Sequence, residues 1–515
     1  MERSNSFIKK HGIFILMLFV YAIANVFFLE QFPFMHSDES WLSGFSQTVL
    51  KEGRFDLTEP FFNLYPRNPH AIKIFFVAIQ AFVINLFGHS LFNMRMISLV
   101  SGLFSLCLFY RIVMTRFGNS KFALLATGLL AVDIQFIYAS HLARQESILL
   151  LISLAAYDYF IRKNPPTTRS AAMLAVILAL GIGIHPNSFI ISIPFGLMLF
   201  YRFLNNRARG VDLLAFTVVL GAAAAFFIAL SLRMDPGFIG NYAAYGETLG
   251  VAESLVSKLL QIKLFYQKLF LQVSGTYYTP DIRLQLLLMI PASLWGIARL
   301  VKSKGTSGEA YPLLGLLGIN LGYLLVGRYN QTSIVFLFPW FYLLTAELLY
   351  PLTKQRNALL GILVAATLSI SCFQIAAHPG KDYSSYLEKI SSQVPKDARV
   401  LANLNTGYYF NPDNLRDYRN LAHLKENSLS FEDYIDMNQI EFILYPEEMD
   451  IIWNTRPVYN SLYGNPADYY ESMKTFLEED CMLVGTFTDD TYPVRIVRLM
   501  GQKERTLRIY KVLDR

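Results

Sequence analysis

The chain has 515 residues, of which 53% are hydrophobic and only 16% are charged. Because a soluble chain of this length carries about a quarter charged residues, the composition excludes an ordinary soluble protein and indicates a polytopic membrane protein. The net charge of +6 reports topology more than partners, and no basic tract with interleaved aromatic residues suggests nucleic acid. The three cysteines, Cys107, Cys372 and Cys481, offer neither a disulfide framework nor a cysteine metal site.

Hydrophobic runs of membrane-spanning length recur along the first three-quarters of the chain. The first run has a site at Ala22-Ile23-Ala24 typical of signal-peptide cleavage, but apolar residues continue to Leu29, so we interpret it as a retained helix. We expect about eleven transmembrane helices, over residues 13–29, 94–113, 122–139, 146–161, 171–184, 188–203, 212–232, 284–301, 312–327, 332–350 and 357–375.

Segment 71–87 decides on which side of the membrane every later loop lies. It is apolar but contains Lys73, Gln80 and Asn85. If it does not cross the membrane, the basic clusters of the connecting loops fall on one side, as the positive-inside rule requires. We therefore predict a juxtamembrane or re-entrant segment and a cytoplasmic N-terminus.

This topology divides the chain into a transmembrane domain, residues 1–376, and a soluble extracytoplasmic α/β domain, residues 377–515. The transmembrane domain has two long outer loops, 30–93 and 233–283. The α/β domain shows short runs typical of strands at 399–404, 441–445, 482–486, 495–499 and 506–512 and a helical stretch at 382–392. It lacks a Gly-rich phosphate loop, so we predict no nucleotide site. In the second loop, the amphipathic stretch 257–273 is either a helix at the membrane interface near a lipid substrate or an ordinary packed helix.

Ionisable residues at membrane depth are rare and usually functional. In the predicted topology they gather at the outer face: Asp38, Glu39, Arg67, His70, Lys73, Arg95, Arg144, Glu146, His185, Asp281 and Arg328. Both signs of charge are present, as a site needs if it binds an anion and removes a proton.

The adjacent acids Asp38 and Glu39 follow the first span directly. One of them can serve as a general base that deprotonates a hydroxyl. The alternative is that Ser37 is an N-cap and the acids mark an ordinary helix start.

Arg144, Arg328 and His185 of the outer loops are candidates for binding a phosphate. Arg144 and Arg328 are the best of them, because guanidinium groups bind phosphate oxygens bidentately. Snorkelling at a span end is the alternative for these arginines and for Arg95. His185 either hydrogen-bonds a substrate or ends a helix. No His/Asp cluster has metal-ligand spacing.

The layout resembles the membrane glycosyltransferases of the GT-C fold. The resemblance rests on the acidic pair after the first span, Asn93-Met94-Arg95 at the start of the next, the Leu142-Ala143-Arg144-Gln145-Glu146 loop, and Arg328-Tyr329 before a late span. Within that superfamily the chain is most similar to the branch of protein O-mannosyltransferases and lipid A aminoarabinose transferases. The family often has a His-Pro-Pro-Leu-like motif where this chain has Arg67-Asn68-Pro69-His70, and Arg-Pro-Asp where it has Arg144-Gln145-Glu146.

The resemblance implies an inverting transferase that moves a sugar from an undecaprenyl or dolichyl phosphate to an acceptor hydroxyl on the extracytoplasmic face. It implies Asp38 as the base, with Glu39 in support. The expected substrate- and phosphate-binding residues are Lys73, Arg95, Arg144, Glu146, His185, Arg328 and Tyr329. We expect no required cofactor, although a divalent metal stays compatible with the pattern. The expected partners are the lipid-linked donor, a lipid, glycan or protein acceptor, and membrane lipids.

Two other classes of protein account for less of the sequence. A non-enzymatic lipid or glycan transporter would place polar residues near the bilayer midplane, often with repeated halves. A structural membrane subunit would leave the one-sided ionisable residues unexplained. The expected location is a bacterial inner or plasma membrane, with an endoplasmic reticulum equivalent as the alternative.

Overall fold

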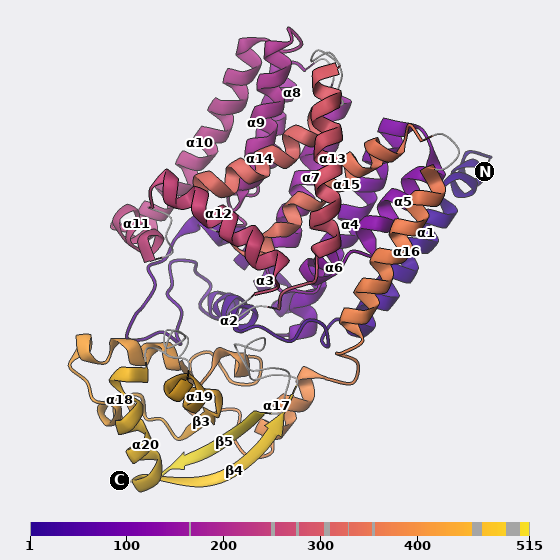
Figure 1. Cartoon of the computed structure of the whole chain (residues 1–515). Helices are drawn as coiled ribbons and strands as arrows, with labels where there is room; N and C mark the ends of the chain where they lie inside the picture. Colours follow the sequence, from indigo (N-terminus) through magenta and orange to yellow (C-terminus); the bar gives the residue numbers. More distant parts are fainter. Residues whose placement is uncertain are drawn as a thin grey trace.

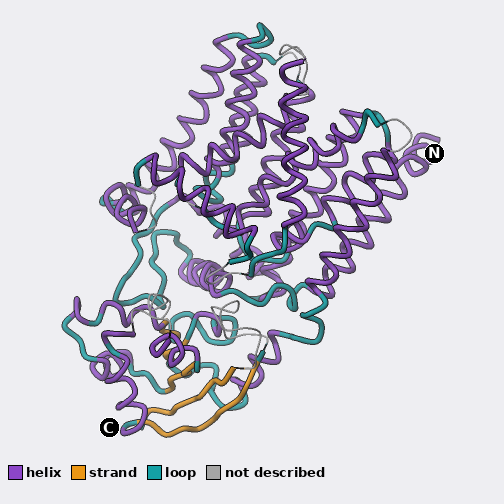
Figure 2. The backbone as a smooth tube through the Cα atoms, viewed as in Figure 1, coloured by secondary structure: helices purple, strands orange, loops and turns teal. Residues whose placement is uncertain are grey.

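The structure is a computed structural model that describes residues 2–163, 166–248, 253–273, 278–302, 310–327, 329–352, 356–455, 466–490 and 505–513. Helices dominate its first three-quarters. Within the described residues, strands occur only in the C-terminal part, which lies at one end of the helix bundle (Figure 1 and Figure 2).

The bundle contains a helix at each predicted span: α1 (Glu2–Phe28), α4 (Leu91–Phe117), α5 (Ser120–Ala131) with α6 (Ile134–Ser140), α7 (Glu146–Arg162), α8 (Thr168–Ala179), α9 (Ser188–Leu204), α10 (Gly210–Met234), α13 (Arg283–Lys302), α14 (Tyr311–Val326), the 3-10 segment η3 (Gln331–Leu337) with α15 (Phe338–Leu349), and α16 (Arg356–Ile375). Six spans in the described chain are long and apolar enough to cross a membrane, or seven if the bent pair α5–α6 is one span. Several shorter apolar helices accompany them. The chain is thus a polytopic helical membrane protein.

The break between α5 and α6 has a local cause. Asp133 is the N-cap of α6 and accepts a hydrogen bond from the backbone N–H of Gln135 at 2.8 Å. A residue whose side chain caps a new helix ends the preceding one, and the two segments meet at 67°. The buried Asp133 carboxylate also accepts from Gln285 and Tyr342, which ties this break to α13 and α15.

Burial distinguishes the central helices from the peripheral ones. In the span formed by η3 and α15, 94% of residues are buried, compared with 11% in α1 and in α10. Lipid tails are as apolar as leucine, so exposed apolar side chains on the outer helices are compatible with a bilayer. The η3–α15 span therefore forms the centre of the bundle.

The two long loops of the membrane part carry shorter helices. Loop 30–93 contains α2 (Ser37–Glu52), the 3-10 turn η1 (Ala71–Lys73) and α3 (Ile74–Phe87). Loop 233–283 contains α11 (Phe238–Thr248) and α12 (Leu255–Phe270). Helix α12 covers most of the predicted amphipathic stretch, and its residue Lys258 donates to the carbonyl oxygen of Leu325 on α14 at 3.1 Å.

The described residues of the C-terminal region form a five-stranded mixed sheet in the order β2-β1-β3-β5-β4. Its elements are α17 (Tyr383–Ser391), β1 (Val400–Ala402), η4 (Leu404–Thr406), β2 (Leu415–Asp417), η5 (Tyr418–His423), η6 (Lys425–Asn427), α18 (Phe431–Asn438), β3 (Phe442–Pro446), α19 (Glu448–Thr455), η8 (Pro466–Asp468), α20 (Tyr470–Glu479), β4 (Cys481–Asp489) and β5 (Arg505–Val512). Strand β1 pairs in parallel with β2 and β3, and β5 pairs antiparallel with β3 and β4. Four predicted strands coincide with β1, β3, β4 and β5. The fifth, 495–499, lies outside the described residues, and β2 was not predicted.

Candidate functional site

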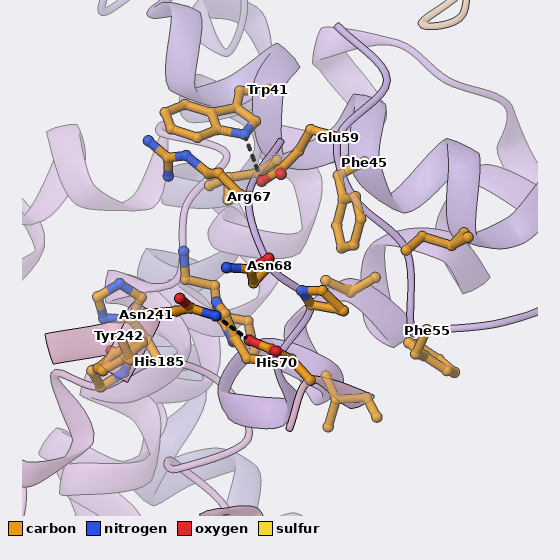
Figure 3. Close-up of a pocket in the computed structure, with 18 of the residues that line it drawn as sticks. Trp41, Phe45, Phe55, Glu59, Arg67, Asn68, His70, His185, Asn241 and Tyr242 are labelled. Carbon is orange, nitrogen blue, oxygen red and sulfur yellow. Dashed lines mark hydrogen bonds between the residues drawn. The ribbon is translucent and has the colours of Figure 1, made fainter. Parts of the chain in front are cut away.

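A pocket of about 320 Å³ lies in the membrane part of the chain, lined by residues between Asp38 and Ala244 (Figure 3). Its walls come from α2, the loop after it, the start of α3, and α11. The polar side chains that line it are Asp38, Glu59, Arg67, Asn68, His70, Lys73, Arg144, Gln145, His185, Asp235, Asn241 and Tyr242. The pocket thus brings together four predicted site residues, Asp38, Lys73, Arg144 and His185.

Helix α2 separates the two adjacent acids. Its N-cap is His36, not Ser37 as predicted: the His36 ring nitrogen Nδ1 accepts from the backbone N–H of Asp38 at 3.1 Å. The Glu39 carboxylate accepts from the backbone N–H of His36 at 2.9 Å, which completes a capping box. Successive residues of a helix point about 100° apart, so only Asp38 of the pair reaches the pocket.

Asp38 is partly exposed and forms an ion pair with Arg144. Arg144 also lies 3.4 Å from a carboxylate oxygen of Glu146, and that oxygen accepts from the Thr332 hydroxyl at 2.6 Å. The guanidinium therefore holds the Asp38 carboxylate in one orientation at the pocket wall. Glu146 is buried behind it and does not line the pocket.

Glu39 and Arg95 form a second pair that is completely buried. Arg95 donates from Nε and from a terminal nitrogen to the two oxygens of Glu39, each at 2.8 Å, and donates further to the carbonyl oxygens of Leu29 and Pro33. The backbone N–H of Ala143 completes the partners of Glu39 at 2.8 Å. The pair joins the segment that follows α1 to α2, α4 and the 141–145 loop, and it lies outside the pocket, although both residues were predicted as site residues.

The segment before α3 supplies three basic groups to the pocket. Arg67 lies over the Trp41 ring, 4.0 Å from its centroid. Lys73 is at the N-terminus of α3, and His70 lies between them in the sequence. Burial, reinforced by Lys73 and Arg67, lowers the pKa of His70 to about 3. His70 is therefore neutral at physiological pH, and the positive charge of this wall comes from Lys73 and Arg67.

The remaining predicted residues lie at other places. His185 is buried at the pocket wall, where its Nδ1 accepts from the backbone N–H of Asn187 at 3.1 Å. The Tyr329 hydroxyl donates to the carbonyl oxygen of Lys258 at 2.8 Å and does not line the pocket. Arg328 lies outside the described residues. In the described ranges, no three His, Cys, Asp or Glu side chains gather into a metal-binding group, and the metal-free site stays a prediction.

Sequence reasoning missed several lining residues. Asp235 and Asn241, joined by a hydrogen bond of 2.8 Å, come from loop 233–283 and line the pocket, where Asn241 lies near His70 (Figure 3). Trp41 and Glu59 form another pair, at 3.1 Å between the indole nitrogen and the carboxylate. Trp41 had a detectable signal, because it lies one helical turn after Asp38. The others lie in loops whose approach to the pocket has no local signature.

Comparisons with known proteins concern the family and the fold. Residues 70–232 match the family model described as dolichyl-phosphate-mannose-protein mannosyltransferase. No curated protein sequence matches the chain. The chain is similar to the crystal structure of ArnT from Cupriavidus metallidurans bound to undecaprenyl phosphate, at 12% identity and a TM-score of 0.51 over 97% of this chain and 98% of that chain.

A second similar structure is the archaeal oligosaccharyltransferase AglB from Archaeoglobus fulgidus, in complex with an inhibitory peptide and a dolichol-phosphate. It shares 12% identity and a TM-score of 0.56 over 93% of this chain and 73% of that chain. At such identities the likeness establishes the fold, and the family model adds the enzyme class over its matched segment. The predicted resemblance is thus confirmed: the chain has the fold of the ArnT and AglB structures, and its residues 70–232 match the mannosyltransferase family model.

Proposed function

We propose that the pocket transfers a sugar from a polyprenyl phosphate to an acceptor hydroxyl, with Asp38 as the general base. The observation that carries the proposal is that Asp38, Lys73 and Arg144 line one pocket. Attack by a hydroxyl needs a proton acceptor, and a departing phosphate needs positive charge. The undecaprenyl phosphate of the ArnT structure and the dolichol-phosphate of the AglB structure support a lipid-linked donor here.

In the proposed reaction, the acceptor oxygen attacks the anomeric carbon while its proton passes to the Asp38 carboxylate. The bond between that carbon and the phosphate oxygen breaks, and its electron pair leaves with polyprenyl phosphate. Lys73 and Arg144 stabilise the charge of the leaving phosphate. Attack from the side opposite the phosphate inverts the configuration at the anomeric carbon, and no cofactor takes part.

We propose eleven membrane spans, with the N-terminus in the cytoplasm. The pocket and the C-terminal domain, residues 377–515, then lie outside the cytoplasm. This arrangement is supported by the distribution of arginines: Arg111 and Arg162 share Asp158, and Arg116 pairs with Glu347, at helix ends remote from Asp38. Lys and Arg are concentrated in cytoplasmic loops. Helix α3, of 14 residues, is proposed not to cross.

Neutralising Asp38 tests the proposal. Asp38→Asn in the full-length protein should lower sugar transfer from a labelled polyprenyl-phosphate donor by a factor of about 10² to 10⁴, the usual contribution of general-base catalysis. The matched control is Asp56→Asn, because Asp56 lies in the same loop and forms an exposed ion pair with Arg54. Transfer by D56N should match the wild type. Undiminished transfer by D38N would remove Asp38 as the base.

A further inference from the structure

Helix α2 has two functional faces. Asp38, Trp41, Leu42 and Phe45 recur at the spacing of one helix face and line the pocket. The opposite face is packed against the C-terminal domain. The orientation of the pocket wall is therefore tied to the C-terminal domain, through contacts such as that of Ser40 with Leu404, which lie 364 positions apart in the chain.

The packed face of α2 consists of small residues that allow a close approach. The Ser40 hydroxyl donates to the carbonyl oxygen of Leu404 on η4. A Cβ atom on Gly407 would lie 3.1 Å from the Cβ of Ser40, and one on Gly44 would lie 3.3 Å from the Phe61 ring. At the end of α2, Lys51 pairs with Asp413 at 2.6 Å.

The buried carboxylate of Asp417 organises this contact from the C-terminal side. It accepts from the backbone N–H of Leu404 at 3.1 Å, which fixes the η4 turn against Ser40. It also accepts from the Arg419 side-chain Nε at 2.6 Å. One carboxylate thus positions two separate groups that contact α2.

Arg419 holds the pocket residue Trp41. Its guanidinium carbon lies 5.0 Å from the centroid of the Trp41 ring and 4.8 Å from that of Phe62, while Arg67 approaches Trp41 at 4.0 Å. Contacts of this kind are worth more when partly desolvated. The indole in turn donates to Glu59 at 3.1 Å, so the Arg419 contact reaches the pocket wall.

The same part of the C-terminal domain fixes the loop that follows α2. The Asn420 side chain donates to the carbonyl oxygen of Phe61 at 2.7 Å and accepts from the backbone N–H of Leu64 at 3.2 Å. Glu59 and Tyr65, which flank these two residues, both line the pocket. The 417–420 segment therefore holds both α2 and the loop.

We propose that Asp417 and Arg419 are positioning residues of the transferase: they act through Trp41 and η4 to set the orientation of α2, and hence of Asp38. They do not touch the substrate. The kinetic part of this proposal rests on the proposed function, whereas its structural part, control of α2 by the C-terminal domain, does not.

Arg419→Ala should lower kcat by roughly 3- to 30-fold, the range that a partly desolvated cation–π contact allows, while the KM for the lipid donor stays unchanged. Arg419→Lys should recover part of this loss, because lysine keeps the charge beside Asp417 but lacks the flat guanidinium. The control variant Arg399→Ala, at an exposed arginine of the same domain, should have the kcat of the wild type.

A double mutant tests whether Arg419 acts through Trp41. In a Trp41→Leu background, Arg419→Ala should lower kcat little further, because the contact between the two side chains is already lost.

Hydrogen exchange in the full-length protein tests the structural part without any sugar transfer. In R419A, amides of α2 and of residues 59–67 should exchange faster, whereas those of β4 should not change. Trp41→Leu, which removes the contact from the membrane side and leaves the C-terminal domain intact, should reproduce the change in α2. Wild-type exchange of α2 in both variants, or additive effects of the two changes on kcat, would overturn the proposal. If the wild-type protein showed no sugar transfer at all, that result would refute only the proposed function.

Discussion

The two adjacent acids of α2 should respond differently to neutralisation. In Glu39→Gln the structure predicts loss of stability, because Glu39 and Arg95 are both fully buried. Four hydrogen bonds point at the carboxylate: two from Arg95 and one each from the backbone N–H groups of His36 and Ala143. A glutamine amide group is a donor at one of its two ends. Whichever way it turns, its NH₂ faces a group that also donates.

Breaking a buried ion pair by removing one partner costs about 3–5 kcal/mol, and the Arg95 charge would be left in the protein interior. We therefore expect E39Q to unfold at a clearly lower temperature than the wild type in a thermal melt of the detergent-solubilised protein. D38N should unfold near the wild-type temperature, because Asp38 is partly exposed at the pocket. If E39Q kept its unfolding temperature while losing transfer as fully as D38N, Glu39 would act in the chemistry and our structural role for it would be wrong.

Three further predictions concern Lys73 of the pocket, His89, and Gly407 at the contact with α2. Lys73→Ala should raise the KM for the donor by about tenfold, from the loss of one charge-assisted contact of about 1.4 kcal/mol, with Lys73→Arg as the control; an unchanged KM would argue against phosphate contact. Burial, with Lys396 nearby, lowers the pKa of His89 to about 4. Since an unfolded histidine titrates near 6.5, the stability contributed by neutral His89 is complete above about pH 6.5 and is lost as pH falls toward 4. His89→Gln should flatten this decline in thermal melts between pH 7 and 5, and an unaltered slope would exclude His89 as its source. Gly407→Ala should lower the free energy of unfolding by about 1–3 kcal/mol, because the added Cβ would lie 2.9 Å from the Leu404 carbonyl oxygen. An unchanged free energy of unfolding would show that the η4 turn accommodates the methyl group.

Part of the architecture was predictable because it depends on local pattern. A helix that crosses a membrane must be apolar over about 20 residues, so the position of each span is visible in the sequence. Short runs typical of strands likewise indicated β1, β3, β4 and β5. Strand β2, Leu415–Asp417, has three residues and forms by pairing with β1, so no local pattern could predict it.

The candidate site, too, was predictable from the sequence in part only. The sequence by itself determined that acidic and basic residues meet at one face, because ionisable side chains near a bilayer occur only where a site or an ion pair stabilises them. Tertiary structure alone decided which of them reach the pocket. Asp38 and Glu39 are identical as sequence signals, and only the rotation of α2 directs one to the pocket and the other to Arg95. The contact of Arg419 with Trp41 joins residues far apart in the chain, and their proximity results from the packing of two domains, which leaves no trace in the local sequence.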